Sequence, residues 1–276
     1  MNTRTRGFLR RAGNAAGISA IAGAWLTAGL SSGLGAEHAK HWAYEDGPDA
    51  VGPAHWGDLP GDGLCALGKR ESPIALSDSG TTAAAPAKQP TLAFAYRPSA
   101  LTMTNNGHTV QVDYAPGSSV SENGVSYSLA QFHFHAPSEH TLDGRRFPLE
   151  IHLVHVDASG RPAVVVGLFA EEGAANGALQ PIFAALPAHS GEKSAPAGAT
   201  VSAAGFLPVD RAFFAYDGSL TTPPCTEGIR WRVFRRPIAL SRAQIESFRS
   251  LPHFAHTNRP EQPIGNRRVT LVGTTP

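Results

Sequence analysis

The sequence predicts a single, mainly β (α+β) domain in which short peripheral helices flank a central, twisted and mostly antiparallel sheet. The 276 residues include 29 Gly and 22 Pro but only 16% charged side chains. That composition is typical of a compact, loop-rich domain rather than of a helical bundle. Strand-like runs recur at short intervals. No repeat or low-complexity stretch divides the chain, so one domain is expected.

Five runs are the clearest strand candidates, because each is either alternating or continuously apolar. Each is bounded by Gly, Pro, Asn or Asp, which favour turns. The five runs span residues 91–96, 109–114, 126–135, 149–156 and 163–170.

Two segments predict helices. The segment 176–186 places its apolar side chains on one helical face, and Pro181 limits where the helix can begin. A second helix is expected to begin at Ser241, because Ser241 and Gln244 have the spacing of a capping box.

The first 36 residues differ in kind from the rest. They carry four arginines and no acid, followed by an apolar run from Ala12 to Leu30 and small residues up to Ala36. This pattern predicts an export signal over 1–36, a mature domain over 37–276, and a periplasmic or secreted location. Polar residues and glycines interrupt the apolar run, so no stable membrane anchor is expected. The export route, general secretory or twin-arginine, stays open.

Charge and cysteine content narrow the partners and the redox compartment. Leaving out the four arginines of residues 1–36 changes the net charge from +1 to −3. A nearly neutral domain argues against nucleic acid or an anionic membrane as a partner. The only two cysteines, Cys65 and Cys225, favour a disulfide in an exported protein. Neither has a close Cys or His neighbour at ligand spacing, which disfavours a zinc site built on them. A homodimer is left open.

The run 131–135 carries the strongest chemical signal. Side chains alternate across a strand, so Gln131, His133 and His135 share one face, while Phe132 and Phe134 face the other. Two imidazoles therefore point into the same space, and the two phenylalanines pack a core.

A second run, 150–155, supplies a third imidazole. His152 shares a face with Glu150, whereas His155 falls on the opposite face. Between the two runs, Asp143-Gly144 is a strong signal for a two-residue hairpin. Such a hairpin would pair residues whose numbers sum to 287, which places His135 opposite His152. Pro137 interrupts the ladder, but a bulge that preserves parity would keep the three imidazoles on one face.

Three neutral imidazoles suit Zn²⁺ and leave a fourth position for water, as in a catalytic site. A lone histidine would be more typical of an ordinary half-buried aromatic side chain. A closed structural site needs a fourth ligand, but neither cysteine lies on these strands. Gln131 and Glu150 could each accept an imidazole N–H and so fix the tautomer of a ligand.

Taken together, the runs resemble the α-class carbonic anhydrases, in a version similar to the secreted bacterial branch. The resemblance covers nearly the whole mature chain in ordered blocks. These blocks are 41–44, 72–74, 105–108, 131–135, 137–140, 150–155, 218–224 and 258–260.

The resemblance implies a zinc enzyme that reversibly hydrates carbon dioxide to bicarbonate and a proton. It also implies that zinc is the cofactor, with carbon dioxide and bicarbonate as the partners. The implied zinc ligands are His133, His135 and His152.

The same resemblance implies further roles. Thr221 would accept a hydrogen bond from the zinc-bound hydroxide and donate its own to Glu139. Thr222 would meet bicarbonate. His108 would be the proton shuttle, although a histidine just after the Asn106-Gly107 turn is usually only a solvated side chain. The implied apolar wall for carbon dioxide consists of Val154, Val165, Leu220, Ile229 and Trp231.

Two residues depart from the commoner pattern of that family. Glu71 stands where Gln usually precedes Ser-Pro, and Ala136 stands where many animal members have Trp. Neither is expected to touch the metal site, so both should affect local packing more than mechanism.

Three other functions were weighed. A catalytically inactive binding module would typically lack one or more of the zinc ligands, and this sequence keeps all three. A zinc-storage protein favours flexible His-rich tracts, whereas most of the 12 histidines are dispersed. Ester cleavage is expected only as a side activity, because no Gly-x-Ser-x-Gly motif is present.

Overall fold

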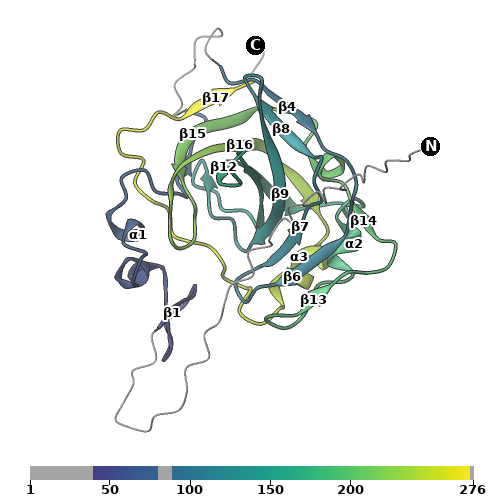
Figure 1. Ribbon diagram of the computed structural model, residues 1–276, viewed down its shortest axis with the longest axis horizontal. Coiled ribbons are helices and arrows are strands. Elements are labelled where there is room, and N and C mark those ends of the chain that lie inside the picture. The colour runs from purple at the N-terminus through teal and green to yellow at the C-terminus, as the bar shows by residue number, and fades with distance from the viewer. Residues whose placement is uncertain (1–39, 80–88, 274–276) are drawn as a thin grey trace, which may run out of the picture. The chain divides into compact units, whose positions relative to one another are not determined.

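A large sheet organises the chain in the computed structural model, which describes residues 40–79 and 89–273 (Figure 1). Among these residues the sheet has eleven strands, with β13-β6-β7-β9-β11-β12-β16-β15-β17 as its main path and β4 and β8 attached through β9. These strands are β4 (Leu92–Ala95), β6 (Thr102–Asn105), β7 (Val110–Asp113), β8 (Ser119–Glu122), β9 (Val125–His135), β11 (Leu149–Val156), β12 (Pro162–Glu172), β13 (Lys193–Ser194), β15 (Phe213–Ser219), β16 (Glu227–Leu240) and β17 (Thr270–Val272).

The sheet is mostly antiparallel, as predicted, since β12 and β16 form its one parallel pair within the described ranges. Three small two-stranded ladders lie outside it. Two of them are parallel, β1 with β2 and β3 with β10, while β5 with β14 is antiparallel. Their strands are β1 (His41–Trp42), β2 (Ala50–Val51), β3 (Ala75–Leu76), β5 (Ser99–Ala100), β10 (Thr141–Leu142) and β14 (Thr200–Val201). The predicted fold class is confirmed.

All five strand candidates are strands, displaced by at most a few residues at their ends. The longest strand, β16, was not among them. Its apolar pattern is broken by Arg230 and Arg232, which both form ion pairs with Glu122. Arg232 is buried, so a charge that reads as exposed in the sequence lies inside the sheet.

The helices are short. The helix expected over 176–186 is only α2 (Gln180–Phe183). Oδ1 of Asn176 accepts the backbone N–H groups of Ala178 and Leu179, so the chain forms a side-chain-capped turn there instead of a helix. The other predicted helix is α3 (Arg242–Arg249), with the capping box formed at Ser241 as expected.

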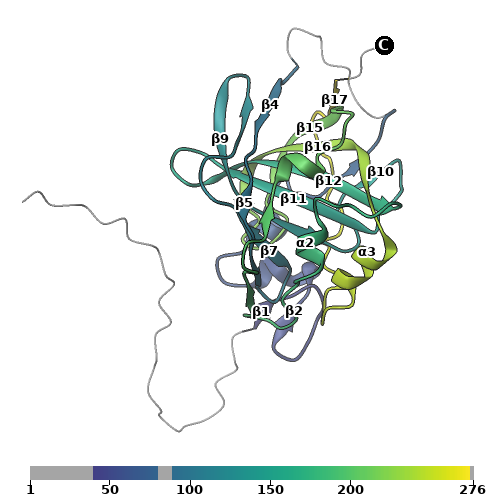
Figure 2. The same cartoon turned by 90° about the vertical axis from the view of Figure 1, so that its right-hand side faces the viewer.

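Three further helical segments lie within the described ranges. Besides α1 (Leu64–Leu67), 3-10 helices occupy Pro53–Asp58 and Ala203–Phe206. Helices α2 and α3 contact each other, and Figure 2 shows them side by side against the sheet. No helix within the described residues is long and apolar enough to cross a membrane.

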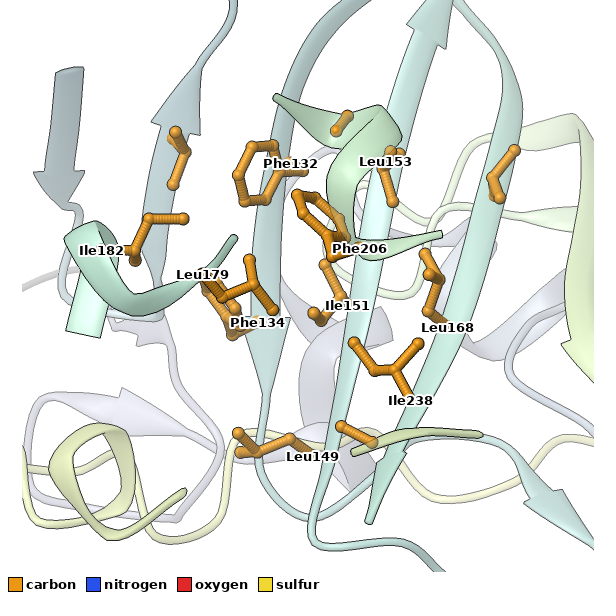
Figure 3. Packing of buried hydrophobic residues seen from close by; sticks show 14 of the residues in the cluster. Phe132, Phe134, Leu149, Ile151, Leu153, Leu168, Leu179, Ile182, Phe206 and Ile238 are labelled. Carbon is orange, nitrogen blue, oxygen red and sulfur yellow. The ribbon is translucent and has the colours of Figure 1, made fainter. Parts of the chain in front are cut away.

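One face of the sheet holds the main apolar core. Figure 3 shows Phe132 and Phe134 of β9 beside Ile151 and Leu153 of β11, all pointing into the same cluster with side chains from α2. Each of these four side chains is fully buried. The alternation predicted for both strands is therefore confirmed on its apolar side.

The predicted disulfide joins Cys65 in α1 to Cys225. Both cysteines pack in a small cluster with Trp56 and the aromatic side chains Trp42 and Tyr44. The compact unit spans His38–Pro276. The expected export signal over 1–36 lies outside the described residues, so it stays a prediction.

Candidate metal centre

Three imidazoles meet on the face of β9 and β11 that lies opposite the core. In the ladder between these strands His133 pairs with His152, and His135 pairs with Glu150. The expected pairing of His135 with His152 is therefore wrong by two residues. The parity is as expected, because a shift of two returns each side chain to the same face.

The turn itself forms where predicted, and the shift has a local cause. Asp143 and Gly144 both have positive φ, and Leu142 and Arg145 exchange both backbone hydrogen bonds, as in a two-residue hairpin. Farther along, Ser138 donates its N–H to the carbonyl of Phe147, so residue numbers there sum to 285. Residues 139–141 on one arm of the hairpin thus lie opposite a single residue on the other arm. This bulge carries Glu139 into the site.

Each imidazole makes one hydrogen bond that fixes its orientation. Nδ1 of His133 donates to Oε1 of Gln131 at 2.8 Å, and Nε2 of His152 donates to Oε1 of Glu150 at 2.9 Å. Nδ1 of His135 donates to the backbone carbonyl of Thr257 at 2.6 Å. Every ring therefore keeps its other nitrogen for a ligand.

These residues fit a metal ion such as zinc. One ligating nitrogen from each of His133, His135 and His152 lies within 4.8 Å of the other two. Nε2 of His135 is buried and has no hydrogen-bond partner. Burial, reinforced by the neighbouring imidazoles, lowers the pKa of both His133 and His135. Both rings are therefore neutral near pH 7, which is the form that binds metals.

A second group, His140, Glu150 and His152, also brings its polar atoms within 4.8 Å. Here the atoms are already engaged. Oε1 of Glu150 accepts from His140 and His152, and Oε2 accepts the backbone N–H groups of Glu139 and His140. Nε2 of His140 is in turn hydrogen bonded to the Tyr216 hydroxyl at 2.6 Å. This group is a buried network that supports the ligand His152.

The carboxylate of Glu150 is ionised within this network. Burial alone would raise its pKa, but His140 and His152 outweigh burial and hold the pKa well below its usual range. A buried carboxylate with four hydrogen bonds fixes both the ring of His152 and the bulge that carries Glu139. The sequence predicted the contact to His152 but not the role of His140.

Glu139 is fully buried behind the three imidazoles. Its Oε1 accepts the backbone N–H of Arg259 at 2.8 Å, and its Oε2 lies 3.5 Å from Nε2 of His135. Oε2 has no hydrogen-bond partner within the described chain. The expected hydrogen bond from Thr221 to Glu139 is therefore not formed in this structure, although Thr221 lies buried in the same site.

The cavity in front of the imidazoles has a volume of about 190 Å³. We call it the metal cavity; its polar lining includes Gln131, His133, His152, Thr221 and Thr222. Four of the five residues expected to form an apolar wall line it, namely Val154, Val165, Leu220 and Trp231. The fifth, Ile229, lines an adjoining cavity and packs in the same apolar cluster.

His108 does not line the metal cavity. Its ring stacks on Trp42, with centroids 3.6 Å apart and planes inclined by 14°. It lines a separate cavity of about 290 Å³ together with residues of the segment 41–50. The structure thus places His108, the expected proton shuttle, outside the metal cavity.

The loop that carries Thr221 is tied to the N-terminal segment. The N–H of Cys225 donates to the carbonyl of Thr222, and the disulfide then links Cys225 to Cys65. The carbonyl of Cys65 accepts from the Arg259 guanidinium at 2.8 Å. Since the backbone N–H of Arg259 also binds Glu139, Arg259 connects the disulfide to the site.

The two departures from the family pattern lie closer to the site than expected. The guanidinium of Arg259 forms a buried ion pair with Glu71 at 2.7 Å, and Glu71 also accepts from the Ser219 hydroxyl. Ala136 donates its N–H to the Thr257 hydroxyl and accepts the Thr257 N–H. Glu71 therefore supports Arg259, which holds Glu139. Ala136 supports Thr257, which holds His135. Backbone contacts of this kind leave no signal in side-chain patterning.

Comparisons with known proteins agree with this geometry. The family model described as eukaryotic-type carbonic anhydrase matches residues 51–272. A carbonic anhydrase of Nostoc sp. is 43% identical over 220 residues, which cover 79% of this chain and 82% of that protein. One of Pectobacterium atrosepticum is 40% identical over 235 residues, covering 85% and 92%. The solved α-carbonic anhydrase of Thermovibrio ammonificans, in complex with the inhibitor sulfanilamide, superposes with a TM-score of 0.76 at 39% identity, covering 84% and 99%.

Proposed function

Because the chain belongs to the family of eukaryotic-type (α-class) carbonic anhydrases, we propose that it hydrates carbon dioxide with a zinc ion held by His133, His135 and His152. The observation that carries this proposal is the gathering of three individually oriented imidazole rings beside an apolar cavity. Zinc held by three imidazoles lowers the pKa of coordinated water to about 7, a value known from carbonic anhydrase itself, and so supplies a nucleophile at neutral pH.

The apolar part of the metal cavity receives carbon dioxide. Val154, Val165, Leu220 and Trp231 offer no hydrogen bond, so an apolar, linear molecule replaces water there at little cost. Ile229 supports this wall from the adjoining cavity. Thr222 then meets the bicarbonate product.

Thr221 and Glu139 orient the attack. In this proposal the Thr221 hydroxyl accepts a hydrogen bond from the nucleophile and donates a hydrogen bond to Oε2 of Glu139. Support comes from the burial of that oxygen without a partner, since a buried carboxylate oxygen gains from a donor. Oε1 is already held by Arg259, which limits the carboxylate to one orientation.

His108 carries the released proton away from the metal cavity. A ring nitrogen accepts it through intervening water and later gives it to solvent. Export through residues 1–36 to the periplasm or cell exterior belongs to the same proposal, and the disulfide supports it.

Stopped-flow measurement of carbon dioxide hydration, with zinc content determined on the same sample, tests the proposal. The Thr221→Ala variant should keep one zinc and lose roughly 10²-fold in rate, the scale of one oriented hydrogen-bonding group. A zinc-replete variant with wild-type rates would remove Thr221 from the mechanism. A zinc-replete wild-type protein without hydration activity would refute the proposed function.

A further inference from the structure

The cavity that His108 lines is unusually rich in imidazole. Besides His108 it is lined by His41, His253 and His256, and by the acids Glu45 and Asp46. We call it the histidine cavity. It shares no lining residue with the metal cavity. Three separate segments build it, namely 41–50, the turn at 107–108, and the stretch 253–256 that follows α3.

We infer that the histidine cavity is the proton exit of the enzyme, in which His41, His253 and His256 take protons from His108 and pass them to solvent. This inference rests on the proposed function. It adds three residues to the route of the proton, beyond the shuttle itself.

The three added imidazoles are free to take up protons. His41, His253 and His256 are exposed to solvent, and no hydrogen bond or ion pair of their side chains occurs in the part of the chain that the structure describes. The volume of about 290 Å³ holds several water molecules, so protons can move between rings that do not touch. Glu45 and Asp46 are the acids that line the same cavity.

His108 is held where it releases a proton readily. Burial, and then the nearby His41, lower the pKa of His108 to about 4 in its stacked position. The Trp42 ring covers one face of the imidazole in this position. A proton that His108 brings into the histidine cavity near pH 7 is therefore released readily.

The two cavities are neighbours. Tyr44 lines the histidine cavity, and its ring centroid is 6.5 Å from that of the ligand His135. His256 directly precedes Thr257, whose carbonyl holds the same ligand. The histidine cavity therefore lies close to one of the three imidazoles proposed to hold zinc.

The transfer balances without any other reactant. The imidazolium of His108 gives its proton to cavity water, and one of the three exposed rings takes a proton from that water. This ring then loses a proton to a buffer base, and His108 returns to the neutral form. No electron moves and no covalent bond between heavy atoms breaks.

A metal site is a weaker interpretation of the same cluster. Among the described residues, the ligating atoms of these four histidines do not come within 4.8 Å of one another in any group of three, unlike those of the zinc triad. The rings are spread around a solvent-filled space, which suits proton relay and not coordination.

A triple variant of the full mature enzyme tests the inference. His41→Gln and His256→Gln remove two imidazoles at exposed positions. His253 has φ of 66°, a left-handed conformation that Asn tolerates well, so His253→Asn is the suitable third change. The matched control is His55→Gln, which removes an exposed imidazole outside the histidine cavity. Thermal melting verifies that each variant is folded.

In dilute buffer the triple variant should lose kcat several-fold and keep kcat/KM for carbon dioxide, whereas His55→Gln should match the wild type. Concentrated imidazole buffer should restore kcat. Added to His108→Ala, the triple change should cause no further loss, because residues of one route are not additive.

Wild-type kcat of the triple variant in dilute buffer would overturn the relay, as would losses that add to those of His108→Ala. Both results leave the proposed function intact, because they require a wild-type enzyme that hydrates carbon dioxide. The absence of hydration by the zinc-replete wild type would instead refute the proposed function.

Discussion

The two faces of the strand pair β9 and β11 are stabilised in different ways. On one face Phe132, Phe134 and Ile151 pack into an apolar core. On the other, His135 and His152 are also buried, at 1% exposure each, yet each ring is held by a hydrogen bond. Packing on the first face depends on the shape and apolar area of the side chains. Burial of the imidazoles on the second face depends on their hydrogen-bond partners.

This difference indicates that the polar face is organised to bind a ligand rather than to stabilise the fold. Buried imidazoles with one nitrogen unused are costly unless something binds that nitrogen. Nε2 of His135 is such a nitrogen, and Oε2 of Glu139 is a buried oxygen that likewise has no hydrogen-bond partner among the described residues. The apolar face has no corresponding requirement. Changes on the two faces should therefore have separable effects on unfolding and on metal binding.

The largest effect on stability is expected on the apolar face. Phe132→Ala should lower the free energy of unfolding by about 3–5 kcal/mol, because it removes a fully buried aromatic ring and leaves a cavity. The folded variant should still bind one zinc per chain. Denaturant unfolding and metal analysis measure the two quantities. Loss of zinc from a variant of unchanged stability would show that the faces are not separable.

A smaller effect is expected from the adjacent residue on the polar face. Gln131→Ala removes the acceptor that orients His133, so zinc affinity should fall about 10–100-fold with little change in unfolding. The matched control is Gln111→Ala: Gln111 pairs with His133 across β7 and β9, but its side chain donates to Asp113. Competition with a chelator measures both affinities. Equal losses in the two variants would contradict an orienting role for Gln131.

The smallest effect is a pH dependence confined to the apoprotein. Burial lowers the pKa of His133 and His135 in the folded state, whereas the unfolded chain has histidine pKa values near 6.5. Below about pH 6.5 the unfolded state therefore binds more protons, and stability is lost as the pH falls. Melting temperatures of zinc-free protein at pH 7.5 and 5.5 test this. The fall should be shallower in His133→Gln, and an unchanged slope would exclude His133 as a contributor.

Periodicity was enough to predict the faces of these strands, the gathering of His133, His135 and His152, and two of the hydrogen-bond acceptors that orient them. The register was wrong because residues 139–141 bulge. Three hydrogen bonds from Glu139 and His140 to the Glu150 carboxylate hold this bulge, and side-chain alternation does not reveal them. The carbonyl of Thr257 could not be predicted, since any residue supplies a carbonyl. The position of His108 on Trp42 depends on a tertiary contact. The ion pair of Glu71 with Arg259 also depends on a tertiary contact.

The most direct test of the account compares two histidines on the same strand. His152 faces the metal cavity, and His155 faces the other side, where its Nε2 is hydrogen bonded to Tyr96. Zinc content and carbon dioxide hydration should be measured for His152→Ala and His155→Ala, with circular dichroism to verify folding. The account predicts that His152→Ala loses most of its zinc and activity, whereas folded His155→Ala keeps one zinc. Full zinc and full activity in His152→Ala would contradict it.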